Sequence, residues 1–213
     1  MIVSLTMLLM AANVAAYVVT IGPDGTIRPD VAWAYGLYAA NLIYHPECLI
    51  THMFLHAGPL HLLFNMLGLL TFGLQLERML SRGEYLFLYL ASGVAGGLLQ
   101  VVVTPNIPTI GASSAVFGLV GCLTMLRPMS MIMFFFVPMP LVLFSVLYAL
   151  AAVFVIESGA FTHVAHAGHL GGMLAGGALA LLYRPREALK GLAAVSVVVL
   201  LLLVGYWMLV GGP

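Results

Sequence analysis

The sequence is poor in charged residues. Asp, Glu, Lys and Arg make up 7% of its 213 residues, and they balance to a formal net charge of zero. Ordinary soluble domains carry about 25% charged residues, and a fold with so few could not cover its own surface with polar groups. The chain also lacks a basic patch that could hold a phosphate backbone. These absences exclude a secreted, disordered or nucleic-acid-binding protein.

Cysteines are scarce, and carboxylates are missing from the apolar segments. Cys48 lies in a polar stretch and Cys122 lies deep in an apolar run, so we predict no disulfide between them. All seven Asp and Glu residues fall in loops or at the ends of apolar segments. A buried Ser-His-Asp triad is therefore not expected, and neither is a carboxylate-based metal site.

Apolar residues are abundant: they make up 63% of the chain, and the mean hydropathy is +1.14. A transmembrane helix needs about 20 apolar residues. The chain holds seven such segments, so we predict an all-α, polytopic membrane protein with one transmembrane domain over residues 1–213. The predicted spans are about 2–21, 58–76, 85–104, 110–126, 138–156, 164–183 and 192–210. Residues 22–51 mix charged and aromatic side chains, which is typical of a loop at the membrane interface.

The basic residues predict the orientation, because cytoplasmic loops carry an excess of Lys and Arg. Arg28 falls in one set of loops, and the other set holds the remaining six. These six are Arg78, Arg82, Arg127, Arg184, Arg186 and Lys190. The N-terminus is thus expected in the cytoplasm and the C-terminus outside. The short chain without a transit peptide suggests the inner membrane of a bacterium.

Polar residues inside the predicted spans gather at one depth. They are His61 and Asn65 near the start of 58–76, Ser113 and Ser114 near the start of 110–126, and His166 and His169 near the start of 164–183. All three spans start at the outer face in the predicted orientation. Polar groups inside a membrane are costly and indicate function. His61 and Asn65 share a helix face, and this pair alone favours a polar contact between helices over a functional site.

Ser113 and His169 are candidates for a catalytic pair. A serine hydroxyl is a weak nucleophile until a base takes its proton, and His169 is expected at the same depth. Both spans carry small residues that let them approach closely. In 164–183 they recur at four-residue spacing as Gly168, Gly172, Gly176 and Ala180, and in 110–126 they are Gly111, Ala115, Gly118 and Cys122. Phe117 lies one turn beyond Ser113 and could stack on the His169 ring. The His61 and Asn65 side chains and the Ser113 backbone N–H are candidate donors to an oxyanion.

Three motifs resemble the rhomboid family of intramembrane serine proteases. They are His52-Met-Phe-Leu-His56-Ala-Gly-Pro-Leu-His61-Leu-Leu-Phe-Asn65, Gly111-Ala-Ser113 and His169-Leu-Gly-Gly172-Met-Leu-Ala-Gly176. The resemblance covers about residues 2–183. It implies a six-helix core, followed here by a seventh, C-terminal transmembrane helix. It also implies cleavage of single-span membrane proteins near the outer face, without a cofactor or metal.

The resemblance assigns expected roles to individual residues. Ser113 matches the nucleophile and His169 the general base, while His61 and Asn65 match the side chains that bind the oxyanion. The supporting positions are Gly111 in the nucleophile motif, Gly172 and Gly176 in helix packing, and His56 in a structural or water-retaining role. Phe117 is expected beside the base.

The chain departs from the family pattern at two places, and two other functions stay open. Ser114 stands where the family often has glycine, which makes it a rival nucleophile. Glu47-Cys48 stands where the family often has Trp-Arg. One alternative is a catalytically inactive relative that binds membrane proteins. The other is a metal or haem protein or a transporter, because all seven histidines fall within 45–61 and 163–169 and imidazoles are good metal ligands.

Overall fold

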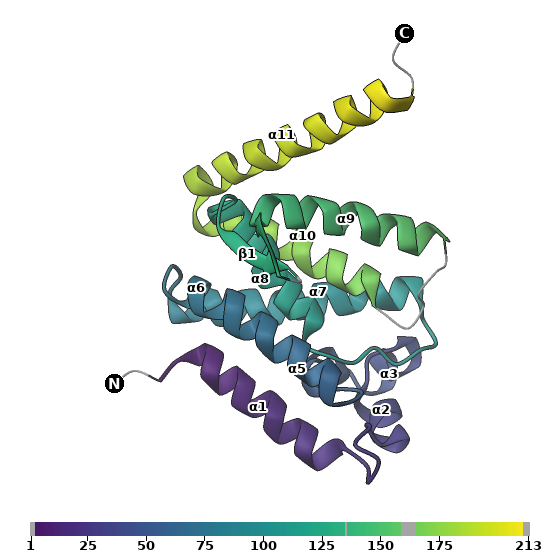
Figure 1. Cartoon of the computed structure of the whole chain (residues 1–213). Helices are drawn as coiled ribbons and strands as arrows, with labels where there is room; N and C mark the ends of the chain where they lie inside the picture. The colour runs from purple at the N-terminus through teal and green to yellow at the C-terminus, as the bar shows by residue number, and fades with distance from the viewer. Residues whose placement is uncertain (1–2, 135, 159–164, 211–213) are drawn as a thin grey trace.

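The structure of the chain, a computed structural model, describes residues 3–134, 136–158 and 165–210 (Figure 1). These residues form a bundle of helices with one antiparallel hairpin of two strands. The helices are α1 (Leu5–Thr20), α2 (Pro29–Tyr35), α3 (Ala39–Tyr44), α4 (Cys48–Thr51), η1 (His52–Phe54), α5 (Pro59–Gly68), η2 (Leu69–Gly73), α6 (Leu74–Glu77), α7 (Arg82–Val103), α8 (Ser113–Leu126), α9 (Leu141–Ser158), α10 (His166–Tyr183) and α11 (Pro185–Val210). The strands are β1 (Met131–Phe134) and β2 (Val137–Pro140).

Helix α8 forms the centre of the bundle and packs against α7 and α10 (Figure 1). Most of its side chains are buried, as expected for a helix that is apolar all round. Helix α10 approaches it at two glycines. A Cβ atom at Gly172 would collide with the carbonyl oxygen of Ser114, and one at Gly176 with that of Gly118. The two helices are thus in backbone contact, and larger residues would force them apart.

The central helix is too short to cross a bilayer. Its 14 residues rise about 21 Å, whereas the hydrocarbon core is about 30 Å thick. The preceding loop, residues 104–112, therefore enters the bundle. Its backbone is paired: Leu37 and Thr109 exchange two hydrogen bonds, and the Ala39 N–H donates to the Pro105 carbonyl. This pairing supports a non-helical segment beside the first residue of α8.

The predicted helical membrane bundle is confirmed, while the predicted number of crossings stays a prediction. Among the described residues, four helices are long and apolar enough to cross a membrane: Pro59–Glu77, Arg82–Val103, Leu141–Ser158 and Pro185–Val210. The first of these combines α5, η2 and α6. Leu5–Thr20 and Ser113–Leu126 are apolar but shorter.

The structure differs from the predicted segments at three places. Helix α11 begins at Pro185, before the predicted 192–210 span, because the charged residues that suggest a loop form its first turns. Residues 22–51 contain α2, α3 and α4 rather than a plain loop. A hairpin, β1–β2, interrupts the otherwise all-α chain just before α9.

The cysteines show a fourth difference. Cys48 does not lie in a loop: it is the first residue of α4, and it is fully buried. Both cysteines are free, as predicted.

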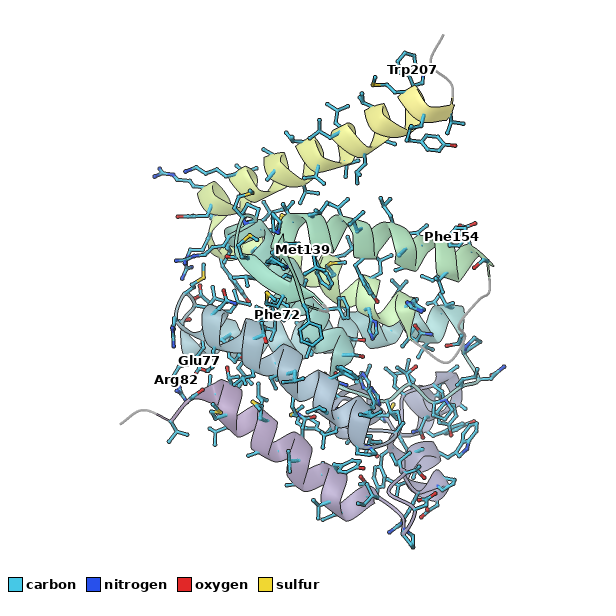
Figure 2. All side chains as sticks on the ribbon, in the orientation of Figure 1. Phe72, Glu77, Arg82, Met139, Phe154 and Trp207 are labelled. Atoms are coloured by element: carbon cyan, nitrogen blue, oxygen red, sulfur yellow. The ribbon has the colours of Figure 1, made fainter. Side chains whose placement is uncertain are left out.

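Acidic side chains link neighbouring helices at the end of the bundle where the chain begins. Figure 2 shows Glu77 and Arg82 there, next to the start of α1. The Glu77 carboxylate accepts hydrogen bonds from the Ser4 hydroxyl at 2.7 Å and from the backbone of Leu5 at 2.6 Å. Glu84 forms an ion pair with Arg184, with 2.9 Å between the charged atoms. The carboxylates thus tie α1 to α6 and α7 to the end of α10.

Candidate active site

Ser113 opens helix α8 after a backbone turn that suits glycine alone. Gly111 has a φ of 120°, which residues with a Cβ rarely adopt. A Cβ there would also lie 2.7 Å from Nε2 of His61. The Gly111 N–H donates to the His52 carbonyl at 2.9 Å, and the His52 Nδ1–H donates to the Cys48 carbonyl at 2.8 Å. The turn before Ser113 is therefore held by α4 and η1.

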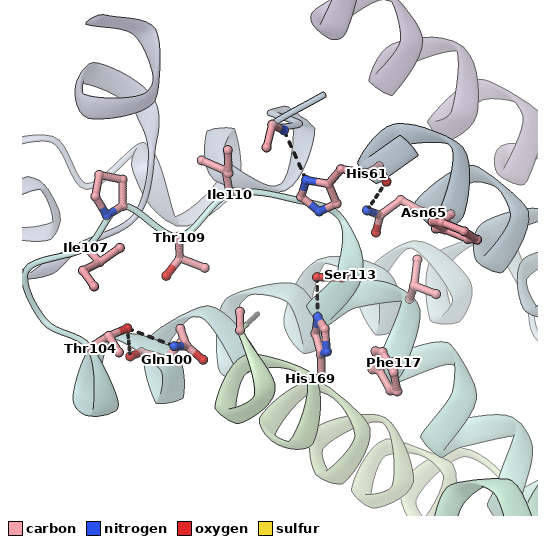
Figure 3. Close-up of a pocket in the computed structure, with 15 residues that line it drawn as sticks. His61, Asn65, Gln100, Thr104, Ile107, Thr109, Ile110, Ser113, Phe117 and His169 are labelled. Atoms are coloured by element: carbon pink, nitrogen blue, oxygen red, sulfur yellow. Dashed lines mark hydrogen bonds between the residues drawn. The ribbon is translucent and has the colours of Figure 1, made fainter. Parts of the chain in front are cut away.

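The structure brings Ser113 and His169 together. Nε2 of His169, in the first turn of α10, lies 2.7 Å from the Ser113 hydroxyl oxygen (Figure 3). The Phe117 ring stacks on the imidazole, with 4.5 Å between centroids and 14° between planes. Ser113 and His169 are both partly buried. The imidazole is thus positioned to take a proton from the hydroxyl group.

A third side chain, which the sequence analysis missed, contacts the same imidazole. The Tyr148 hydroxyl of α9 lies 2.7 Å from Nδ1 of His169. Its ring also packs against Phe117, with centroids 4.3 Å apart. A tyrosine in an apolar helix is ordinary, so only its position inside the predicted 138–156 span could have drawn attention to it.

His61 and Asn65 lie on the opposite side of Ser113 from His169 (Figure 3). The Ala57 N–H donates to Nδ1 of His61 at 3.1 Å, so the neutral ring carries its proton on Nε2. One hydrogen of the Asn65 amide goes to the His61 carbonyl at 2.8 Å, and the amide has a second hydrogen to donate. Two uncharged donors therefore flank the serine.

One cavity of about 530 Å³ is lined by His61, Asn65, Ser113, Phe117 and His169. Its walls come from α5, α7, α8, α10 and the 104–112 loop (Figure 3). Gln100 of α7 and Thr104, the residue that follows α7, extend the polar lining away from Ser113. No carboxylate lines the cavity among the residues that the structure describes. The cavity is large enough to hold several water molecules beside the serine.

Ser114, the rival nucleophile, lies outside this cavity. It is 2% exposed, and its hydroxyl oxygen would lie 2.9 Å from a Cβ added to Gly168. The side chain thus faces the contact between α8 and α10. Adjacent helical residues point about 100° apart, and here Ser113 is the one beside His169.

Gln100 holds the beginning of α10, and the sequence analysis missed it as well. Helix α10 has no side-chain cap from its own N-terminal residue, Ala165. Instead, the Gly168 N–H donates to Oε1 of Gln100 at 2.9 Å, and Nε2 of Gln100 donates to the Thr104 hydroxyl at 2.9 Å. The bond satisfies an amide that a helix end leaves unpaired. A glutamine near the end of an apolar span is the signal that could have indicated this role.

The remaining histidines do not form a recognisable metal site in the described part of the chain. His56 is fully buried, and its ring lies 5.1 Å from that of His61. No group of three or more His, Cys, Asp or Glu side chains could hold a metal among residues 3–134, 136–158 and 165–210. His163 lies outside the described residues. Burial lowers the pKa of His52 and of His56 to about 4, so both loop histidines are neutral near pH 7.

Comparison with known proteins identifies related sequences. The model of the rhomboid domain matches residues 44–186. Rhomboid protease GluP of Bacillus subtilis is 32% identical over 185 residues, which cover 84% of this chain and 35% of GluP. Putative rhomboid protease YdcA of the same species is 41% identical over 93 residues, 43% of this chain and 46% of YdcA. In yeast, mitochondrial Rhomboid protein 1 is 35% identical over 113 residues, 50% of this chain and 32% of that protein. The matches span less than half the length of each relative.

Proposed function

The chain belongs to the rhomboid family, and we propose that it is an intramembrane serine endopeptidase that uses Ser113 and His169. The observation that carries the proposal is the 2.7 Å distance between Nε2 of His169 and the Ser113 hydroxyl oxygen, in a cavity that His61 and Asn65 also line. The similar proteins named as proteases support the same reaction class. The fold supports a multi-pass protein of the membrane.

The reaction proceeds in two steps. The Ser113 oxygen attacks the carbonyl carbon of the substrate peptide while Nε2 of His169 takes the hydroxyl proton. The tetrahedral intermediate collapses, the C–N bond breaks, and His169 gives this proton to the leaving amine. Water then attacks the acyl ester with His169 again as base, and Ser113 recovers its proton as the new carboxyl end leaves.

The negative charge on the attacked carbonyl oxygen is stabilised by uncharged donors. These are Nε2–H of His61, the second amide hydrogen of Asn65 and the backbone N–H of Ser113. The first amides of a helix have no intrahelical partner, and the positive end of the α8 dipole favours an anion there. Removing one such donor in other enzymes costs about a hundredfold to a thousandfold in rate.

The substrate is a single-span membrane protein, cut near the outer face. A peptide bond inside a helix has its N–H and C=O groups paired, so the segment must unwind before Ser113 can reach it. The cavity lies where α5, α8 and α10 begin. With six of seven basic residues on the opposite side, this end faces outward, the N-terminus is cytoplasmic and the C-terminus is outside.

Cleavage of a single-span model substrate in liposomes tests this proposal. The variants are Ser113→Ala, His169→Ala and, as the matched control for the neighbouring hydroxyl, Ser114→Ala, each checked for thermal unfolding. We expect Ser113→Ala and His169→Ala to lose cleavage and Ser114→Ala to keep it. Equal cleavage by all four proteins would exclude the serine mechanism. Loss in Ser114→Ala with retention in Ser113→Ala would move the nucleophile by one residue.

A further inference from the structure

The His169 imidazole is held without a carboxylate. Nε2 faces Ser113, and Nδ1 lies 2.7 Å from the Tyr148 hydroxyl. The ring face is covered by Phe117. No Asp or Glu among the residues that the structure describes lines the cavity. The group that occupies the orienting position beside the base is therefore a phenol from a different helix, α9.

We propose that Tyr148 is a positioning residue that sets the tautomer of His169 by accepting a hydrogen bond from Nδ1–H. The inference rests on the proposed function, since it concerns the general base of that reaction. A neutral imidazole carries one proton, on either nitrogen. To take the Ser113 proton, His169 must present the lone pair of Nε2 to the hydroxyl, so its own proton must be on Nδ1. The Tyr148 oxygen is the acceptor at that nitrogen.

Tyr148 keeps its own proton through the whole reaction. When Nε2 takes the Ser113 proton, the imidazolium donates from both nitrogens, to the leaving amine and to the Tyr148 oxygen. The proton at Nε2 then leaves with the amine, and the starting tautomer is restored. A phenol stabilises the imidazolium less than a carboxylate does. It adds no charge to an apolar bundle, where an ionised carboxylate is costly.

The surroundings of Tyr148 explain the position of its ring. On another side its ring lines a hollow of about 240 Å³, together with Met139, Phe144, Leu147 and Ala151. These neighbours have apolar side chains. The ring is packed between Phe117 and Phe144, with centroids 4.3 and 6.1 Å from its own. Packing thus accounts for the ring, and the hydrogen bond to His169 accounts for the hydroxyl.

The test compares Tyr148→Phe with Tyr85→Phe. Both changes remove one hydroxyl from a tyrosine and leave the ring. The Tyr85 hydroxyl bonds that of Thr6 at 2.9 Å, far from the cavity, so its variant measures the general cost of losing such a bond. We expect Tyr148→Phe to lower kcat about tenfold with KM unchanged, the size of one neutral hydrogen bond. Tyr85→Phe should cleave like the wild type. Equal kcat for Tyr148→Phe and the wild type would overturn the proposal.

A second measurement does not need a substrate. Nitrogen NMR of protein with ¹⁵N-labelled histidine reports which ring nitrogen is protonated, and the His169 signals are identified by their loss in His169→Gln. We expect a protonated Nδ1 in the wild type and a shift toward a protonated Nε2 in Tyr148→Phe. An unprotonated Nδ1 in the wild type would contradict the inference. A wild type that shows the expected tautomer but no Ser113-dependent cleavage would instead contradict the proposed function alone.

Discussion

The two ends of the helix bundle are held together by different kinds of hydrogen bond. At one end, the carboxylates of Glu77 and Glu84 accept from the start of α1 and from Arg184. At the other end, neutral groups join the helices. Ser113 bonds His169 across α8 and α10, and Gln100 bonds the Gly168 backbone across α7 and α10. Carboxylates thus take part in the bonds between helices at one end, whereas the bonds around Ser113 join uncharged groups.

This difference has a physical reason. An ionised side chain is tolerated where water and lipid headgroups reach it, and it is costly within the membrane. The cavity around Ser113 is lined by residues of α5, α7, α8 and α10 and of the 104–112 loop. Reactive groups there must be polar yet neutral at rest. The comparison therefore predicts that changes at the charged end lower stability alone, while changes at the neutral end lower activity as well.

The largest loss of stability is expected at the backbone contact between α8 and α10. Gly176→Val would place side-chain atoms against the Gly118 carbonyl, and the backbone there cannot move aside without separating the helices. We expect roughly 4 kcal/mol or more of destabilisation, enough to lose the folded state. Gly205→Val is the matched control, because nothing lies within 4 Å of a Cβ there. The measurement is thermal unfolding of both variants in detergent. Similar unfolding midpoints for Gly176→Val and Gly205→Val would refute the packing argument.

Acid should destabilise the end of the bundle that contains Ser113, because it protonates the buried His52 and His56. His52 and His56 have pKa values of about 4 in the folded chain and about 6.5 when unfolded. The unfolded chain therefore binds more protons between these values. Stability is fully present above about pH 6.5 and falls as the pH drops toward 4, by roughly 3 kcal/mol for one such histidine.

Unfolding midpoints measured between pH 7.5 and 4.5 test this slope. His56→Gln should flatten it, because the substitution removes one of the two buried rings. An identical pH dependence in His56→Gln and the wild type would contradict the assignment to the buried ring.

A smaller effect is expected from Gln100→Leu. The change leaves the Gly168 N–H without its acceptor, which costs about 2 kcal/mol for a buried amide. It also loosens the turn of α10 that carries His169, so cleavage per folded molecule should fall. Gln75→Leu is the control, since Gln75 bonds the carbonyl of its own helix at the opposite end. Unchanged cleavage and stability in Gln100→Leu would show that α10 does not depend on this bond.

The smallest effect is expected at the charged end. Glu84→Gln removes the ion pair with Arg184, whose side chain is 37% exposed and therefore partly screened. We expect a loss of about 1 kcal/mol in the free energy of unfolding, with cleavage per folded molecule unchanged. Glu187→Gln, in the first turn of α11, controls for the loss of one negative charge. A fall in cleavage per folded molecule in Glu84→Gln would contradict the predicted difference between the two ends.

Much of the arrangement could be predicted because it depends on residues near one another in sequence. Composition predicts the membrane bundle, and the four-residue spacing of Ser113 and Phe117 predicts that both face the same neighbour. The order of three motifs places His61, Ser113 and His169 at one depth. Each of these inferences needs only the period of a helix and the alternation of spans.

What could not be predicted depends on contacts between distant segments. Tyr148 and His169 belong to different helices, and their contact depends on how α9 packs against α10 (Figure 1). The short helices of 22–51 are too short to be stable alone, and the segment between α2 and α3 is held by backbone hydrogen bonds between Leu37 and the distant Thr109. The start of α11 was missed because charged residues in a first turn resemble a loop.

The most direct test of the central claim is covalent labelling of the nucleophile. The protein is treated with a fluorophosphonate probe, and the labelled residue is located by mass spectrometry in the wild type and in His169→Ala. Because His169 activates Ser113, we predict an adduct on Ser113 in the wild type, none on Ser114, and little in His169→Ala. Labelling of Ser114, or equal labelling of Ser113 with and without the His169 imidazole, would contradict the account.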